Sequence, residues 1–349
     1  MNRHAGGPGG RRIDVPRGLV TAPDGLLLLD KPAGITSHDA VAMTRRLAAT
    51  RKVGHAGTLD PMATGLLLLG IGRATRFLTH LVGADKTYGA TVRLGQTTLT
   101  EDADGEITGS CGCTAESGLT ARIDAALSGL TGPIMQVPSS VSAIKVDGVR
   151  SYARVRDGED VTLPARPVTI HGLIRTGDPR PATSVDGTAV VDLDLEVHCS
   201  SGTYVRALAR DLGAALGCGA HLTVLRRTGV GPFTVAESAA VESLAATVGA
   251  GQGLPVMPLV EVARRCFSAV ALKADEARAL RFGQALPAEV LDRARVPQQP
   301  AGPQAVGGGA PHVAAGFDPA GGLVALLTLK RGSTRPVLVL PEASTNTSE

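Results

Sequence analysis

The sequence predicts an α+β protein in which a larger domain of mixed helices and strands is followed by a small β-rich domain. Apolar or alternating segments typical of strands are interspersed with amphipathic segments typical of helices over residues 21–250. The composition then turns glycine-rich near 245–255, which indicates a linker. Two apolar segments, at about 312–317 and 323–329, predict strands of the small domain, residues 256–349.

Composition supports a globular protein of about two domains. The chain has 349 residues, 43% of them hydrophobic and 19% charged, which excludes a disordered chain. No apolar run approaches the roughly 20 residues of a membrane-spanning helix, so we expect no membrane association. Five cysteines, an odd number, argue against a disulfide framework and favour a reducing, cytoplasmic compartment. They show no metal-ligand spacing, so we expect no metal site.

Basic residues are clustered although the net charge is only +3. Residues 1–20 hold four arginines among glycines and lack the apolar core of a secretory signal, so we expect a disordered basic arm. Basic patches suit a polyanionic partner, although a solvated helix face is the common alternative. Two further clusters are Arg45, Arg46, Arg51 and Lys52, and Arg206, Arg210, Arg226 and Arg227.

The first half of the chain is expected to alternate between strands and helices. The leucines of 26–29 predict a buried strand, and Thr36 or Ser37 is expected to cap the helix that follows it. The other elements expected in this half are a strand at 66–71, a helical piece from 72, an alternating strand at 86–95, a loop at 96–110, a helix at 120–127, an extended stretch at 136–145 and a charged loop at 147–166.

The second half contains the clearest alternation in the chain. Residues 191–197 place apolar and acidic side chains on opposite faces of a half-buried strand. A turn and an amphipathic helix follow, with Arg206 and Arg210 four residues apart on one face, so this unit aims Arg206 at the end of the strand. The remaining expected features are a helix at 274–282, a Pro/Gly/Gln-rich insertion near 291–311 and a strand at 336–340.

A polar stretch at 54–65, Gly-His-Ala-Gly-Thr-Leu-Asp-Pro-Met-Ala-Thr-Gly, precedes the apolar strand at 66–71. Its three glycines, Gly54, Gly57 and Gly65, allow backbone conformations closed to other residues. Pro61 fixes its own backbone and biases Asp60 toward an extended conformation. We therefore expect a carboxylate held in a loop beside the core, although Asp-Pro is also an ordinary turn pair.

Tyr88 stands out because aromatic residues make up only 2% of the chain and tryptophan is absent. It lies in the alternating strand at 86–95. A tyrosine there is commonly a cross-strand packing residue, and that alternative stays open.

Taken in this order, the segments resemble the TruB-type tRNA pseudouridine synthases over residues 24–235. Several separated motifs in one order are far more specific than a single motif. The motifs are Asp30-Lys31-Pro32 with Thr36-Ser37, the stretch 54–65, Lys86-Thr87-Tyr88, Ser142-Ala143-Ile144-Lys145, residues 199–206 from Cys199 to Arg206, and residues 221–233 from His221 to Phe233.

The resemblance implies a pseudouridine-synthase fold and a tRNA substrate. The fold has a mixed, largely antiparallel sheet with flanking helices, a site in a central cleft, and a small PUA-like C-terminal domain that grips tRNA on its acceptor-stem side. Enzymes of this family isomerise the T-loop uridine at tRNA position 55 to pseudouridine, so the T-arm of tRNA is the expected partner. The resemblance implies no cofactor, and we expect a monomer.

Matching motif to motif assigns roles to individual residues. Asp60 corresponds to the catalytic aspartate, as nucleophile or as base, and Arg206 to its counter-charge. Tyr88 corresponds to the tyrosine that stacks on the flipped base, and His55 to a histidine that replaces that base in the RNA stack. Tyr204 and Leu225 are expected to line the pocket, whereas Lys31 and Lys145 are either structural or phosphate contacts. Candidates for the phosphate backbone are Arg45, Arg46, Lys52, Arg226 and Arg227.

The chain also departs from the family pattern, and rival functions remain. Ser139 and Val141 occupy places where the family often has a proline and an aromatic residue. A sibling synthase acting on another RNA is one rival, and the lack of long basic extensions speaks against it. A tRNA-folding protein without turnover is a second. An unrelated hydrolase using Asp60 is a third, and it lacks a paired carboxylate or a Ser/His set.

Overall fold

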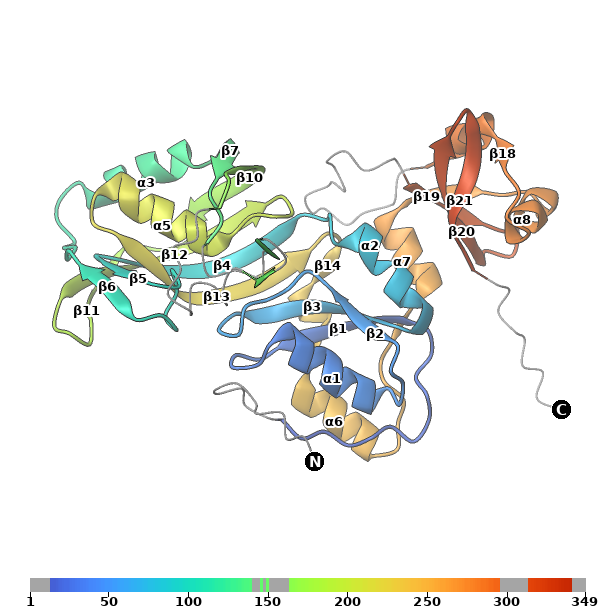
Figure 1. Cartoon of the computed structure of the whole chain (residues 1–349), viewed down its shortest axis with the longest axis horizontal. Coiled ribbons are helices and arrows are strands. Elements are labelled where there is room, and N and C mark those ends of the chain that lie inside the picture. The colour runs from blue at the N-terminus through green and yellow to red at the C-terminus, as the bar shows by residue number, and fades with distance from the viewer. Residues whose placement is uncertain (1–12, 140–144, 147–148, 151–162, 296–312, 341–349) are drawn as a thin grey trace.

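The computed structural model describes residues 13–139, 145–146, 149–150, 163–295 and 313–340 (Figure 1). The expectations for residues 1–12, for most of the stretch 140–162 and for most of the insertion near 291–311 lie outside the described residues. Within the described ranges, no helix is long and apolar enough to cross a membrane.

A twelve-stranded mixed sheet forms the larger part of the described chain. Its pairs are antiparallel except for two, β1 with β15 and β3 with β13, so the predicted mixed, largely antiparallel sheet is confirmed. The main path runs through β15 (Ala239–Ala240), β1 (Gly25–Lys31), β3 (Thr64–Ile71), β13 (Ala220–Val230), β4 (Lys86–Leu94), β12 (Ala189–Cys199), β10 (Arg166–Arg175) and β7 (Gly132–Gln136). Short strands join this path at its sides: β2 (Val53–Ala56), β11 (Arg180–Thr183), β14 (Phe233–Thr234) and β16 (Met257–Pro258).

A smaller five-stranded sheet and two hairpins complete the described strands. The smaller sheet has the order β17 (Ser268–Ala271), β19 (Val313–Phe317), β20 (Leu323–Lys330), β21 (Ser333–Val339) and β18 (Leu286–Pro287). The hairpins are β5 (Gln96–Thr98) with β6 (Ile107–Ser110), and β8 (Lys145–Val146) with β9 (Val149–Arg150). The β-rich C-terminal segment predicted from the sequence is therefore present.

Helices flank the large sheet, and Figure 1 shows them in two groups joined by the long strands β4 and β13. One group contains α3 and α5, and the other contains α1 and α6. The described helices are α1 (Ser37–Leu47), α2 (Leu78–Leu81), α3 (Leu119–Gly129), α5 (Val205–Leu216), α6 (Val241–Gly249), α7 (Leu259–Cys266) and α8 (Ala274–Arg281), with 3-10 turns η1 (Gly72–Arg76), η2 (Val235–Glu237) and η3 (Ala288–Arg293).

Helices α1 and α5 follow from local sequence signals. Thr36 caps α1, since its side chain accepts the Asp39 N–H while the Asp39 carboxylate accepts the Thr36 N–H. Helix α5 ends at Gly217, whose φ of +74° is a left-handed conformation that favours glycine. The start of α1 and the end of α5 thus follow from capping residues, and α5 carries Arg206 in its first turn.

Three expectations about the chain need correction. Residues 96–110 form the β5–β6 hairpin, and the expected plain loop was wrong because strands of three and four residues show little periodicity. The glycine-rich linker is shorter than 245–255, because α6 continues to Gly249. Gly54 has no left-handed backbone, unlike Gly57 and Gly65; a side chain there would instead press on Leu78, 3.2 Å from the added Cβ.

Candidate active site around Asp60

Asp60 lies in the connection between the antiparallel strands β2 and β3, and the loop is pinned to the start of α1. The Ser37 hydroxyl accepts the Leu59 N–H at 2.9 Å and donates to the Leu59 carbonyl at 3.1 Å. The Gly34 N–H donates to the Pro61 carbonyl at 2.9 Å. Leu59 is 3% exposed, so it anchors the loop in the core. The expectation of a held loop beside a buried strand is confirmed.

Arg227 also holds this loop, through hydrogen bonds to backbone carbonyls. Its guanidinium donates from Nε to the Leu66 carbonyl at 2.8 Å, and from its two other nitrogens to the carbonyls of Thr58 and Gly57. It is 1% exposed, so the expectation that it reaches an RNA phosphate was wrong. Gly65 is needed beside it, because an added Cβ would lie 2.3 Å from the Arg227 carbonyl oxygen.

Lys31 is also completely buried. Its ammonium group donates to the carbonyls of Pro32 and Ile35 at 2.9 Å and approaches that of Pro61 at 3.4 Å. Burial lowers the pKa of Lys31 to about 8, although the charge of Asp60 favours its protonated form. Of the two alternatives for Lys31, this geometry favours the structural one over a phosphate contact, since the amine is bonded to the loop.

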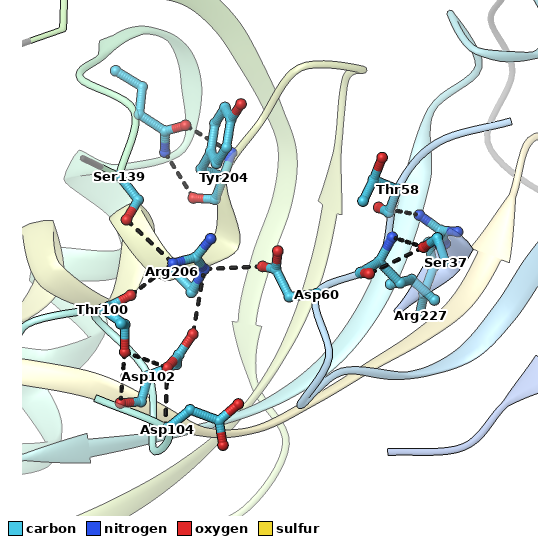
Figure 2. Close-up of polar contacts among 12 residues, drawn as sticks. Ser37, Thr58, Asp60, Thr100, Asp102, Asp104, Ser139, Tyr204, Arg206 and Arg227 are labelled. Atoms are coloured by element: carbon cyan, nitrogen blue, oxygen red, sulfur yellow. Dashed lines mark hydrogen bonds and ion pairs between the residues drawn. The ribbon is translucent and has the colours of Figure 1, made fainter. Parts of the chain in front are cut away.

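Arg206 reaches Asp60 from the opposite side, from the first turn of α5 (Figure 2). Its Nε donates to Asp60 Oδ2 at 2.9 Å, and another nitrogen donates to the Thr100 carbonyl at 2.7 Å and the Ser139 hydroxyl at 3.2 Å. The Arg206 side chain is 6% exposed, whereas that of Asp60 is 37% exposed. The pair thus presents a carboxylate to solvent while its guanidinium partner stays buried.

Asp102 is a second carboxylate against Arg206, and the sequence analysis missed it. Its Oδ2 lies 3.6 Å from Arg206 Nε, and its side chain is 6% exposed. Its other oxygen accepts hydrogen bonds from the Thr100 hydroxyl and from the Asp104 N–H. Burial raises the pKa of Asp102, while these donors and Arg206 lower it. The only sign of Asp102 in the sequence was a run of acidic residues in a polar loop.

A strained turn brings Asp102 into place. Glu101 has a φ of +62°, a conformation that L-residues rarely adopt. Its carboxylate pairs with Arg210 at 2.8 Å, and its carbonyl accepts the Leu222 N–H at 3.0 Å. The turn directs the Thr100 carbonyl and the Asp102 carboxylate at Arg206, and Glu101 pairs with Arg210. Both arginines of α5 are therefore bonded to this turn.

The predicted base-contacting residues lie in β4, in β13 and directly before α5. Tyr88 lies in β4 opposite Arg227, and burial raises the pKa of its hydroxyl. Leu225 lies two residues before Arg227 in β13, so both face the same side of the sheet. Tyr88 and Leu225 are 8% and 6% exposed. Tyr204 precedes α5 and exchanges two hydrogen bonds with the Gln136 side-chain amide.

His55 and Lys145 complete the predicted set. His55 lies in β2, and its ring meets that of His38 edge-on with centroids 5.8 Å apart. Burial lowers the pKa of His55, so the neutral ring is favoured. Lys145 begins the short strand β8, and its side chain lies outside the described part of the structure.

The basic cluster at the end of α1 lies on the surface, and two of its arginines contact other groups of the protein. Arg45 donates to the Val53 carbonyl at 3.2 Å, and Arg46 approaches Asp14 at 3.7 Å. Arg226 grips Asp30 with two nitrogens at 2.7 and 2.9 Å. Among the residues that the structure describes, no group of three or more His, Cys, Asp and Glu side chains is placed to hold a metal ion.

Comparisons with known proteins agree with this arrangement. Residues 45–205 match the TruB family pseudouridylate synthase N-terminal domain, and residues 206–253 match the tRNA pseudouridylate synthase B C-terminal domain. The chain is 52% identical over 321 residues to the tRNA pseudouridine synthase B of Arthrobacter sp. strain FB24, covering 90% of this chain and 96% of that protein. It is 49% identical to the protein of the same name from Streptomyces griseus, covering 92% and 98%.

A solved structure supports the fold. An H/ACA ribonucleoprotein bound to a substrate RNA containing 2′-deoxyuridine has a TM-score of 0.62 with this chain at 22% identity. The match covers 91% of this chain and 85% of that one. At this level of identity the likeness concerns the fold alone, and it confirms the predicted fold class.

Proposed function

Because the chain belongs to the TruB family of pseudouridylate synthases, we propose that it is an isomerase that converts a uridine of tRNA to pseudouridine. The observation that carries the proposal is the Asp60–Arg206 pair, a partly exposed carboxylate in a pinned loop with a buried guanidinium at 2.9 Å. The relatives that share about half of its residues over nearly their whole length bear the name of this activity.

The finer assignments are also proposals. We propose that the target is the T-loop uridine at tRNA position 55, and that the enzyme acts on the T-arm as a monomer in the cytoplasm. Residues 21–250 would carry the catalysis and residues 256–349 would bind RNA as a PUA-like domain. The resemblance of the separated motifs to the family supports these assignments.

Asp60 is the proposed catalytic group. It acts as nucleophile or as base while the glycosidic C–N bond breaks and a C–C bond forms at C5 of the uracil. Arg206 binds its Oδ2, so Oδ1 is the oxygen proposed to react. A charge-assisted bond to one oxygen fixes the direction of the carboxylate. Arg206 therefore positions Asp60 and offsets the cost of its partial burial.

The base must leave the RNA stack to reach Asp60, which costs a few kcal/mol. We propose that Tyr88 and Leu225, adjacent on one face of β4 and β13, form the apolar floor beneath the base. Stacking on an aromatic ring returns about 1–3 kcal/mol. Tyr204 would border the same space, and His55, neutral because it is half-buried, would fill the gap left in the RNA. Lys145 remains a predicted substrate contact.

The test is pseudouridine formation on an unmodified tRNA transcript by the wild type and by Asp60→Asn, with tRNA binding measured for both. We expect the wild type to convert the T-loop uridine. Asp60→Asn should bind tRNA equally well and lose about a thousandfold or more in rate, because the reacting oxygen is gone. Asp178→Asn is the matched control, since the Asp178 side chain is 97% exposed.

Two outcomes would contradict the proposal. If neither wild type nor variant converts the uridine while both bind tRNA, a tRNA-folding role replaces catalysis. If the wild type converts a uridine outside the T-loop, the sibling-enzyme alternative replaces the assigned position.

A further inference from the structure

Helix α7 is the direct connection between the large sheet and the smaller one. Strand β16 ends at Pro258, directly before α7, and pairs with β1 of the large sheet. Strand β17 starts at Ser268, shortly after α7, and pairs with β19 of the smaller sheet. Figure 1 shows α7 between the two sheets, with the smaller sheet at one end of the molecule. The orientation of the smaller sheet therefore depends on how α7 is held.

Two adjacent arginines in the last turn of α7 contact different sheets, since neighbouring residues of a helix point about 100° apart. Arg265 faces the large sheet. Its guanidinium binds both carboxylate oxygens of Glu237 at 2.7 and 3.0 Å and donates to the Pro232 carbonyl at 2.8 Å. It also lies over the Phe233 ring, 4.7 Å from the ring centre. Arg265 thus ties α7 to the segment that follows β13.

Arg264 faces the smaller sheet. Its guanidinium lies over the Phe317 ring, 4.4 Å from the ring centre, and donates to the Gly321 carbonyl at 3.0 Å. Phe317 ends β19, and Gly321 lies in the turn to β20. A Cβ on Gly321 would lie 3.3 Å from an Arg264 nitrogen, so the glycine leaves room for the guanidinium. Each sheet is therefore bound by its own arginine.

These polar contacts add direction to an apolar contact that lacks it. Val262 and Ala263 of α7 are fully buried in the hydrophobic cluster that both sheets share. Hydrophobic contact is non-directional, so it holds the sheets together without setting their angle. A guanidinium that meets a carboxylate through two bonds has a fixed geometry. The two arginines are thus the groups that set the angle.

We propose that Arg264 and Arg265 determine the preference for whole tRNA over its isolated T-arm, by holding the smaller sheet at the angle at which both sheets contact one RNA. This rests on the proposed function, in which tRNA is the substrate and the smaller sheet binds RNA. The end of β20 and the start of β21 suit a polyanion, because their cations are exposed and pair with no carboxylate that the structure describes. These cations are Lys330, Arg331 and Arg335.

Orientation matters because two contacts on one RNA reinforce each other only when both can form at once. After the first contact forms, the second is intramolecular, and its effective concentration depends on the connection between the two binding units. The gain is lost when the geometry forbids simultaneous contact. A T-arm hairpin reaches only the large sheet, whereas a whole tRNA continues from the T-arm into the acceptor stem. Arg264 and Arg265 act through the smaller sheet, so they are positioning residues.

The test measures dissociation constants and single-turnover pseudouridine formation with two transcripts, a whole unmodified tRNA and a hairpin of its T-stem and T-loop. We expect wild type to bind the tRNA more tightly than the hairpin. Arg265→Leu and Arg264→Leu should each weaken tRNA binding about tenfold and leave hairpin binding and the rates at saturating RNA unchanged. Arg265→Lys keeps the charge without the planar fork, so it should regain part of the tRNA affinity.

Arg175→Leu is the matched control. Arg175 also joins a carboxylate, that of Asp124, to a backbone carbonyl, that of Gly177, but all three residues belong to the large sheet and its helix α3. This variant should bind both RNAs as wild type does. Circular dichroism shows whether each variant is folded. Glu237→Gln removes the charge that Arg265 binds, and it replaces Arg265→Leu if that variant does not fold.

An equal loss of affinity for tRNA and hairpin would overturn the proposal, because Arg265 would then support the site itself. Unchanged affinity of Arg265→Leu for both RNAs would overturn it as well, and so would a wild type that binds the hairpin as tightly as the tRNA. Conversion tests the proposed function separately. If wild type converts neither RNA, that function fails, while the dissociation constants still decide whether the two arginines select whole tRNA.

Discussion

At the scale of single residues, the site depends on one guanidinium shared by two carboxylates. Arg206 is buried between Asp60, which is partly exposed, and Asp102, which is not. A buried guanidinium that loses the charge of one partner shifts toward the partners that remain, which for Arg206 are Asp60 and Thr100. Asp102 therefore acts through Arg206, by holding the guanidinium at the angle at which Nε meets Asp60, and it is a positioning residue.

Asp102→Asn should lower the rate of pseudouridine formation by about 100-fold, because a shift of about 1 Å at the reacting group costs that much. The tRNA affinity and the free energy of unfolding should change little, by about 1 kcal/mol at most, since the amide oxygen can still accept from Thr100 and Asp104. Single-turnover rates, tRNA binding and urea unfolding measure the three quantities. Asp104→Asn is the control, and an equal loss in that exposed variant would contradict the role.

The raised pKa of Asp102 predicts that the rate of pseudouridine formation falls at acidic pH, which gives an acid limb in the pH–rate profile. An ordinary aspartate is protonated below about pH 3.9, whereas burial shifts the protonation of Asp102 to higher pH. As pH falls through that raised pKa, Asp102 loses its charge and its hold on Arg206, so the rate should fall while the protein is still folded. Single-turnover rates measured from neutral pH downward should show this limb in wild type and a flatter profile in Asp102→Asn. Identical profiles would refute it.

The residues differ in how far their positions were predictable. Asp60 and Arg206 lie in local motifs, so the resemblance transferred them to matching positions. Asp102 depends on the positive φ of Glu101, which no residue pattern announces. Arg227 was assigned to RNA because it adjoins Arg226. In a strand, neighbours face opposite sides, so Arg226 reaches Asp30 while Arg227 is buried.

At the scale of elements, the N-terminal end of α1 has two adjacent hydroxyl residues with separate roles, the cap Thr36 and the first helical residue Ser37. Thr36 caps the helix through its bond with the Asp39 N–H. Ser37 bonds both backbone groups of Leu59 and so fixes the loop that carries Asp60. One residue therefore stabilises a helix, and the next connects that helix to the reacting group.

Ser37→Ala and Thr36→Ala should separate these tasks. Both should lower the free energy of unfolding, Thr36→Ala by about 1 kcal/mol for the lost cap and Ser37→Ala by about 1–3 kcal/mol for two unpaired backbone groups. Only Ser37→Ala should also slow pseudouridine formation at saturating tRNA, by about tenfold, because the loop loses its anchor. Urea unfolding and single-turnover rates test this. An equal rate loss in Thr36→Ala would show that helix stability alone matters.

Elements with an unbroken hydrophobic pattern could be predicted from the sequence, and strands interrupted by bulges could not. Strand β12 and helix α5 were predicted because their burial follows the alternation and the helical period of the sequence. Strand β13 was not, because register shifts at 222/224 and 227/229 break its alternation. Strand β10 has a similar shift at 170/172. The pairing partners that impose these bulges are far away in the sequence.

At the scale of the whole molecule, strands β1 and β3 are buried on both faces. Leu27, Leu29, Leu67 and Leu69 belong to the main hydrophobic cluster. Leu26, Leu28, Leu66 and Leu68 belong to a second cluster that includes residues of α7 and of the smaller sheet. This explains the two runs of four leucines, because a strand covered on both faces reads as continuous apolar residues. The C-terminal sheet thus shares a hydrophobic cluster with one face of β1 and β3.

Phe267 tests whether the two sheets unfold together. It is 4% exposed in the second cluster, and its ring meets that of Phe77 edge-on at 6.2 Å. Phe267→Ala should lower the free energy of unfolding by about 3–5 kcal/mol. Because the cluster is shared by both sheets, urea unfolding followed by circular dichroism should remain a single transition at lower urea, with pseudouridine formation lost in the same step. Phe282→Ala is the matched control, since Phe282 is 74% exposed and its loss should change stability by about 0.5 kcal/mol or less. Two separate transitions in Phe267→Ala, with activity surviving the first, would show instead that the smaller sheet is an independent unit and that β1 and β3 are stable without their second cover.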